Sequence, residues 1–98
     1  MGKYRISRKA VADLDGIWEY TVGAWSEEQA ASYYRQIYTS IQSLPDLPDY
    51  LERKYDAVKA GLFGYRVGHH VIFYKRHLDG TVWVDRIIHE RMDFQRHF

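Results

Sequence analysis

The chain contains no cysteine. Disulfide bonds, thiolate nucleophiles and cysteine-ligated metals are therefore excluded, and this usage agrees with a reducing cytosol. Long apolar runs are also missing, since no stretch approaches the roughly 20 apolar residues that span a membrane. Residues 1–5 lack the apolar core of a signal peptide. We therefore expect a cytoplasmic protein with no membrane partner.

A strong excess of either charge is missing as well. The formal net charge is +1, but residues 1–49 carry 5 basic and 7 acidic side chains, whereas residues 50–98 carry 9 and 6. All five histidines stand at or after position 69. This asymmetry indicates different faces for different partners. It is too mild for a typical nucleic-acid-binding domain, so we expect no direct contact with nucleic acid.

What is present suits one domain over residues 1–98, because 46% of the residues are hydrophobic and can supply a core. Residues 3–7 alternate like a strand. Residues 8–24 show helical spacing, and Ser7 can cap this helix. The expected inward face consists of Val11, Leu14, Trp18 and Thr21/Val22, with Ala10 and Ile17 beside it. On this register we expect Trp18 to be mostly buried against the sheet or the second helix.

A second helix is predicted directly after the first. Ser26 and Gln29 form a capping box, and the apolar spacing continues to about Leu44. Pro45 and Pro48 end the helix. Because the break between the helices is so short, the two should form an antiparallel hairpin.

The second half of the chain is predicted to be rich in strands. After a polar connector over residues 45–61, strands are expected at 62–67, 70–76 and 81–89, with hairpin turns at 68–69 and 78–80. The residues after Met92 form a short tail with one possible helical turn. The predicted class is α+β, with element order β-α-α-β-β-β and a helical hairpin packed on a small antiparallel sheet.

The sheet should be apolar on both faces. Ile72 and Tyr74 point to one side of their strand, and Val71 and Phe73 point to the other. The hairpin can cover only one face. The second face is either a docking groove, with Tyr74 and Trp83 as candidate anchors, or is covered by the connector. The tyrosines at positions 33, 34, 38 and 50 are likewise open to two interpretations, as interface residues or as core filling.

Few residues suggest catalysis. His69 and His70 are adjacent, so in a strand they point to opposite faces and cannot chelate one metal together. His89-Glu90 begins like a zinc-protease motif, but Asp93 stands where the second histidine would be. We therefore expect no metal and no cofactor. His89, Arg91 and His97, with Tyr74 nearby, could serve a ribonuclease, or they could simply end a strand and decorate a tail.

Three segments resemble the ParE toxins of the ParE/RelE superfamily, in the same order and spacing over nearly the whole chain. The first segment holds Ala10, Ala12-Asp13-Leu14-Asp15, Ile17-Trp18 and Tyr20. The second holds Gly61-Leu62, Val67-Gly68 and His70-Val71-Ile72-Phe73-Tyr74. The third holds Val84, Arg86-Ile87-Ile88-His89, Arg91-Met92-Asp93 and His97-Phe98.

The resemblance implies the toxin of a plasmid or chromosomal type II toxin–antitoxin system. It implies a cognate antitoxin with a ribbon-helix-helix or similar DNA-binding domain, whose arm folds across the toxin in a hetero-oligomer. It also implies inhibition of DNA gyrase by binding rather than by catalysis. The alternatives are a ribosome-dependent messenger-RNA endonuclease of the RelE type and an inactive relative that binds only its antitoxin.

The residues favour the binding type. RelE-like cleavage uses lysines on the first strand after the helices, yet Leu62, Phe63, Gly64 and Tyr65 include none, and Val71 replaces the next strand's arginine. Only Arg91 matches. Phe63, Gly64, Arg66 and His69 depart from the usual ParE pattern, which bears on the identity of the antitoxin.

We expect two partner surfaces. The target should contact the C-terminal segment, through Arg91, Phe94, Arg96, His97 and Phe98. In the alternative, Phe94 and Phe98 fold back against the sheet. The antitoxin should contact Tyr34, Tyr38, Arg66, Tyr74 and Trp83.

Overall fold

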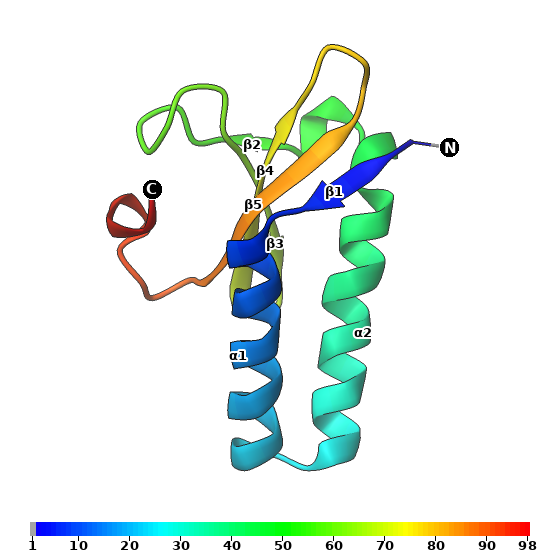
Figure 1. Ribbon diagram of the computed structural model, residues 1–98, viewed down its shortest axis with the longest axis vertical. Coiled ribbons are helices and arrows are strands. Elements are labelled where there is room, and N and C mark those ends of the chain that lie inside the picture. Colours follow the sequence, from blue (N-terminus) through cyan, green and yellow to red (C-terminus); the bar gives the residue numbers. More distant parts are fainter. Residues whose placement is uncertain (1) are drawn as a thin grey trace.

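The computed structural model describes residues 2–98, and Figure 1 shows two long helices below a small twisted sheet. The main elements are β1 (Tyr4–Ile6), α1 (Arg8–Ala24), α2 (Glu27–Ser43), β2 (Arg53–Lys54), β3 (Phe63–Val67), β4 (His70–Arg76) and β5 (Val82–His89). Short 3-10 turns occur at Leu44–Asp46, Asp49–Leu51 and Phe94–His97. The predicted α+β order is confirmed.

The helix boundaries follow the predicted caps. The Ser7 hydroxyl accepts a hydrogen bond from the Ala10 amide, and the chain leaves α1 at Trp25. In α2, the Ser26 hydroxyl accepts from the Gln29 amide while the Gln29 side chain accepts from the Ser26 amide, so the capping box is complete. Side chains thereby satisfy amides that the first helical turns leave free.

The sheet has the strand order β1-β5-β4-β3-β2. Strands β3 to β5 form the predicted antiparallel meander, but β1 pairs with β5 in parallel through Tyr4 to Ile6, opposite Val82 to Val84. The connector was predicted to lack strands, yet Arg53 and Lys54 pair with β3. A register shift between Phe73 and Tyr74 marks a bulge in β5 at Asp85.

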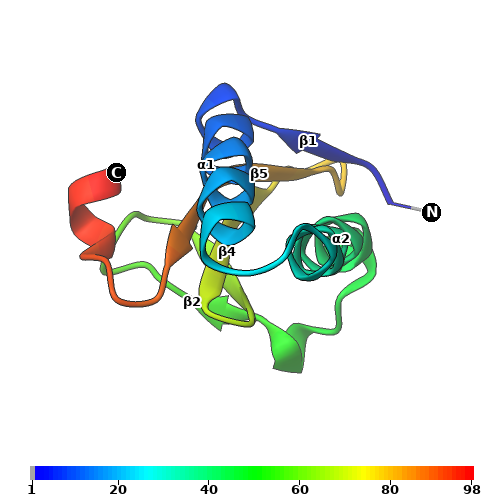
Figure 2. The ribbon, with the colours of Figure 1, turned by 90° about the horizontal axis from the view of Figure 1, so that it is seen from below.

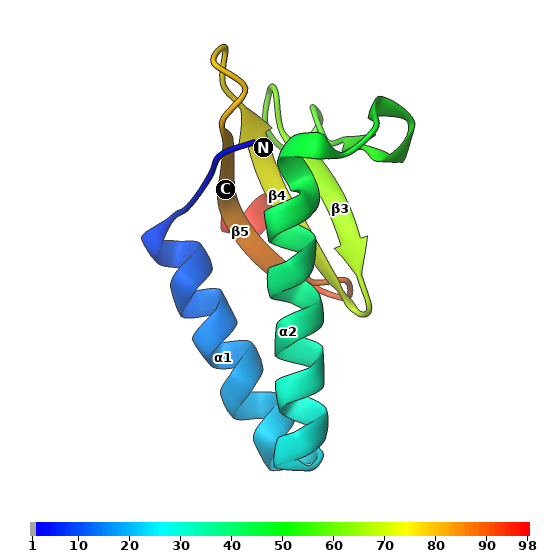
Figure 3. The same cartoon turned by 90° about the vertical axis from the view of Figure 1, so that its right-hand side faces the viewer.

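The helical hairpin covers one face of the sheet, and both helices extend beyond it (Figures 2 and 3). Ile72, Tyr74, Val82, Val84 and Ile87 pack there against the buried side chains of the hairpin. Those on the helices are Ala10, Leu14 and Ile17 of α1 and Ile37 and Ile41 of α2. This cluster is the main core.

The predicted inward face of α1 is rotated from the observed one. Ile17, only 8% exposed, lies in the core, while Val11 is exposed and Trp18 is partly buried. The indole of Trp18 instead meets the ring of Tyr34 edge-on, with 6.1 Å between centroids. The prediction that Trp18 is mostly buried against the sheet or the second helix is therefore confirmed for the second helix, although the indole is not part of the main core.

The second face of the sheet is covered over its lower half. Val71, Phe73 and Ile88 form a smaller cluster with Leu62, and Tyr55, Val58 and Phe94 pack on it. The connector therefore covers part of this face, together with the C-terminal turn. A Cβ atom on Gly64 would lie 2.4 Å from the Tyr55 ring, so the glycine allows the connector to lie this close.

A buried polar group ties the connector to the sheet. The Glu52 carboxylate accepts from the Tyr74 hydroxyl at 2.8 Å and from Arg76 Nε at 2.6 Å. Arg76 also donates to the Leu44 carbonyl at the end of α2. Burial raises the pKa of the Tyr74 hydroxyl, and the Glu52 carboxylate raises it further. The arginine thus joins α2, the connector and β4 at one point.

Within residues 2–98, no helix has the length and apolar character to span a membrane.

Candidate functional site

A groove runs along the free edge of β5. Strand β1 stops at Ile6, opposite Val84, whereas β5 continues to His89 without a neighbouring strand on that side. The groove between this edge, α1 and the C-terminal segment encloses about 590 Å³. Its lining includes Gly16, Ile17, Tyr20, Trp25, Tyr33, His70, Ile87, His89, Met92 and His97. Most of these side chains are apolar or aromatic, which suits a protein segment better than a small polar substrate.

Asp13 closes the upper end of the groove. Its carboxylate accepts from the Ile87 amide at 2.9 Å, and from Arg86 Nε and Nη2 at 2.8 Å each. Above it, the Ser7 hydroxyl donates to the Asp85 carbonyl at 2.7 Å. Side chains from α1 and its cap therefore supply hydrogen-bond partners for the backbone of β5 where strand pairing ends.

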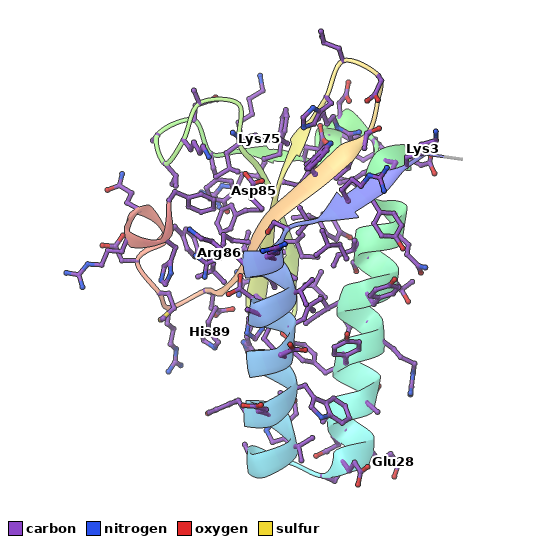
Figure 4. The ribbon with its side chains drawn as sticks, viewed as in Figure 1. Lys3, Glu28, Lys75, Asp85, Arg86 and His89 are labelled. Carbon is purple, nitrogen blue, oxygen red and sulfur yellow. The ribbon has the colours of Figure 1, made fainter. Side chains whose placement is uncertain are left out.

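Arg86 joins this edge to the C-terminal segment. Besides its paired hydrogen bonds to Asp13, it donates from Nη1 to the His97 carbonyl at 3.2 Å. The hydrogen bond with Asp13 raises the pKa of Arg86. Arg86 and His89 lie on β5 on the α1 side in Figure 4. The wall of the groove and the C-terminal turn are thus held by one guanidinium.

Tyr33 fastens the β3–β4 turn to α2 at the opposite wall. Its hydroxyl lies 2.6 Å from His70 Nδ1, 3.2 Å from the Val67 carbonyl and 3.1 Å from the His69 amide. Gly68, in the turn, has a φ of +56°, and a Cβ there would lie 2.6 Å from the Tyr33 ring. Only glycine meets both requirements without strain.

The environment of His70 favours the neutral ring. Burial, with smaller contributions from His89 and His69, lowers the pKa of His70 to about 4. Glu90 and Asp13 act in the opposite direction. The nearby His89 accepts at Nδ1 from the Arg91 amide at 3.1 Å. Within residues 2–98, no group of three or more histidine, aspartate or glutamate side chains is arranged to hold a metal ion.

The five residues expected to contact the target lie together at the C-terminal end. Phe94 and Phe98 fold back onto Phe73, with ring centroids 4.9 and 5.3 Å apart. Arg91 and Arg96 are exposed, and Arg96 makes only a 3.6 Å contact with Asp93. The segment is therefore packed against the sheet rather than extended. A role in binding a target stays a prediction for these residues.

The five residues expected to contact the antitoxin do not form one surface. Tyr34 and Tyr38 lie on α2, and Tyr38 contacts Tyr4. Trp83 lies on the second face of the sheet, and Arg66 pairs with Glu90 at 2.6 Å. Tyr74 has no exposed surface at all, so it cannot anchor a partner in this structure. Its hydroxyl donates a hydrogen bond to the Glu52 carboxylate inside the protein.

The sequence patterns did not predict that Asp13, Arg86 and Tyr33 would frame a groove. A signal was available for two of them. Asp13 stands one helical turn before Ile17, on the border of the buried face, and Arg86 directly precedes the apolar pair at the end of β5. Opposite charges on the borders of two packed elements are candidates for an ion pair.

Known proteins are similar to this sequence along nearly its full length. Residues 4–94 match the family described as the ParE toxin of the type II toxin–antitoxin system parDE. Toxin ParE1 of Caulobacter vibrioides is 35% identical over 97 residues, which cover 99% of this chain and 98% of the relative. Toxin ParE1 of Mycobacterium tuberculosis is 33% identical over 94 residues, which cover 96% and 95%.

Solved structures share the fold. A chain of the chromosomal ParDE system of P. aeruginosa superposes with a TM-score of 0.77 at 20% identity, over 91% of this chain and 96% of that one. A chain of the RelBE2 toxin–antitoxin complex of M. tuberculosis gives 0.57 at 18% identity, over 90% and 96%. The two helices on a mostly antiparallel sheet are thus common to these proteins. On its sequence, this chain belongs to the ParE toxin family of type II toxin–antitoxin systems.

Proposed function

We propose that this ParE toxin acts in the cytoplasm by binding and inhibiting DNA gyrase, and that a cognate antitoxin neutralises it. The observation that carries the proposal is the apolar groove along β5, whose wall includes His97 of the C-terminal segment, to which Arg86 of β5 donates a hydrogen bond. One continuous surface can therefore serve both partners. The antitoxin would carry a ribbon-helix-helix or similar DNA-binding domain, as the family resemblance implies.

The groove suits the arm of an antitoxin. Its walls offer Trp25, Tyr20 and Met92 as partly exposed apolar surface, and aromatic side chains are frequent interface anchors. An arm that orders on binding needs a large interface, so we expect more than about 2,000 Å² to be buried in total. The two structural relatives come from systems named for such pairs, ParDE and RelBE2.

The C-terminal segment suits contact with the target. Phe94 holds the turn against the sheet, which leaves Arg91 and Arg96 exposed and His97 in the groove wall. Arginine is enriched where interfaces concentrate their binding energy. An antitoxin arm in the groove would contact His97 and so cover part of the target surface.

The structure offers little to a ribonuclease. Strand β3 carries no lysine, and Val71, where an arginine would be needed, is buried in the smaller cluster. His70 is held by Tyr33 and has a low pKa, so it is a poor proton donor near neutral pH. These features favour inhibition by binding.

Induction of the toxin without antitoxin tests the proposal. We expect incorporation of labelled thymidine to fall before incorporation of labelled leucine, and the purified protein to inhibit supercoiling by gyrase. Exchange of Arg91 and Arg96 for glutamine should weaken both effects, whereas the exposed Arg35→Gln in α2 should not. An earlier loss of leucine incorporation with cleaved messenger RNA would instead establish the ribonuclease. Antitoxin binding without growth arrest would establish an inactive relative.

A further inference from the structure

Two cationic side chains flank an exposed tryptophan on the second face of the sheet. Arg5 of β1 and Lys75 of β4 are both register partners of Trp83 in β5, so the three residues form one row across adjacent strands. The neighbours of Trp83 in β5, Val82 and Val84, are buried beneath the helices. Because side chains alternate along a strand, Trp83 and its two partners point away from the helices.

A third cation joins this row from the connector. The side chains of Lys59 and Lys75 are adjacent, and burial lowers the pKa of Lys75, as does the neighbouring Lys59. Asp85 attracts Lys75, but this effect is the smaller one. Figure 4 shows Lys75 and Asp85 near each other at the upper part of the sheet.

Asp85 lies near Lys75 but forms no ion pair with it among residues 2–98. Within residues 2–98, none of the ion pairs at 4.0 Å or less includes Arg5, Lys59 or Lys75. An anion bound between these cations would relieve the repulsion between the two lysines.

The aromatic part of the surface is accessible. Trp83 is 41% exposed, and the ring of His77 lies 4.9 Å from its ring at a tilt of 38°. The connector and Phe94 cover the sheet nearer Val71, away from Trp83. We name Arg5, Lys59, Lys75, His77 and Trp83 the basic platform.

We propose that the basic platform binds single-stranded nucleic acid, with the cations on the phosphates and a base stacked on Trp83 or His77. Proteins that bind single strands without sequence preference combine these two features. Arg5 and Lys75 lie two strand spacings apart, roughly 10 Å, on either side of the indole. An acidic peptide would instead be expected in a groove with side-chain pockets, and the groove along β5 contains no residue of the platform.

This site is independent of the groove and of gyrase. The whole-chain charge of +1 gave no reason to expect nucleic-acid binding. The fold changes that expectation because it brings cations from β1, β4 and the connector, which lie far apart in the sequence, onto one side of the sheet.

Fluorescence anisotropy with a labelled 20-nucleotide oligo(dT) tests the proposal on the full chain. We expect micromolar affinity at 50 mM salt, and a slope of log K against log salt near −2, as contact with about three phosphates implies. Arg5→Gln, Lys59→Gln and Lys75→Gln together should weaken binding at least tenfold and flatten the slope. Trp83→Leu should weaken it roughly 5- to 100-fold and leave the slope unchanged, since one stacked base is lost.

A control variant with the same net charge separates the platform from bulk charge. It carries Arg35→Gln, Arg91→Gln and Arg96→Gln at exposed positions elsewhere. Equal weakening by the control and the platform variant would overturn the proposal, as would the absence of binding at 100 μM protein in low salt. Tighter binding of labelled poly-glutamate than of the oligonucleotide would also overturn it, in favour of an acidic protein partner. The lysine and arginine variants keep the test valid if Trp83→Leu fails to fold.

Discussion

Asp13 and Arg86 form a paired ion contact that replaces a strand neighbour at the edge of β5. The two side chains are 15% and 17% exposed, and the same carboxylate accepts from the Ile87 amide. The contact therefore does three things at once. It fastens α1 to the sheet, completes the hydrogen bonding of β5 and positions the arginine that reaches the His97 carbonyl.

We predict that Asp13→Asn lowers the free energy of unfolding by about 2–3 kcal/mol, because Arg86 is left mostly buried without a counter-charge. Urea denaturation followed by circular dichroism measures the change. The exposed Asp15→Asn, two residues further along α1, should change the free energy of unfolding by less than about 0.5 kcal/mol. Equal effects of the two substitutions would show that the ion pair contributes little.

The register of α1 predicts that truncation of the smaller side chain, Ile17, costs more free energy of unfolding than truncation of the larger one, Trp18. Ile17→Ala should cost about 2–4 kcal/mol because it opens a cavity in the main core. Trp18→Ala should cost less, about 1–2 kcal/mol, because the indole is partly buried and loses chiefly its edge-on contact with Tyr34. Both are measured by urea denaturation. A larger loss for Trp18→Ala would mean that the helix is rotated from the register described.

His70 should make stability depend on pH below neutrality. Its folded pKa of about 4 lies below the 6.5 of an unfolded histidine, so the unfolded chain takes up the proton first as the pH falls. The contribution is fully present above pH 6.5 and is lost between pH 6.5 and 4. For a half-buried ring we expect about 1–2 kcal/mol after solvent screening.

The comparison that isolates this effect is between variants at each pH. His70→Gln should remove this part of the loss between pH 6.5 and 4, because glutamine does not titrate and can still accept from Tyr33. The exposed His77→Gln should keep it. If His70→Gln loses stability with pH as steeply as the parent protein, the ring is not held neutral by its surroundings.

The C-terminal segment should separate stability from toxicity at two neighbouring positions. Phe94→Ala should cost about 2 kcal/mol, because the ring packs on Phe73 and Tyr55, and growth arrest should weaken as the turn loosens. Arg96→Gln should leave the melting temperature unchanged and still weaken growth arrest. Melting curves and colony counts after induction measure both.

Deletion of residues 96–98 extends this test. Removal of Phe98 takes away a ring that contacts Phe73, so we expect a modest drop in melting temperature together with the loss of toxicity. A fully toxic truncated protein would show that the segment does not contact the target. The loop between α1 and α2 would then be the next surface to examine.

Local signals in the sequence were sufficient for much of the fold. Ser7, the Ser26 and Gln29 pair, and the Asp79-Gly80 turn each act through neighbouring residues, and the structure shows all of them where the pattern predicts. These features depend on short-range hydrogen bonds and backbone preferences, which any reading of neighbouring residues can detect.

The remaining features depend on contacts between distant residues. Strand β1 pairs with a segment almost 80 positions later, and Asp13 meets Arg86 across 73 positions. Sequence alternation made Tyr74 a candidate exposed anchor. The residue is buried instead, and its hydroxyl donates a hydrogen bond to Glu52 of the connector. The candidate partner surfaces shared this difficulty, since Trp83 and Tyr34 proved to lie on opposite sides of the sheet.

The pairing of β1 with β5 also determines how late in synthesis the sheet can close. Residues 4–6 are synthesised 78 positions before their partners at 82–84. Until then, the apolar side of α1 has no complete sheet to pack on, and long-range pairing of this kind forms late. A chain released early by a stalled ribosome therefore lacks both the closed sheet and the groove.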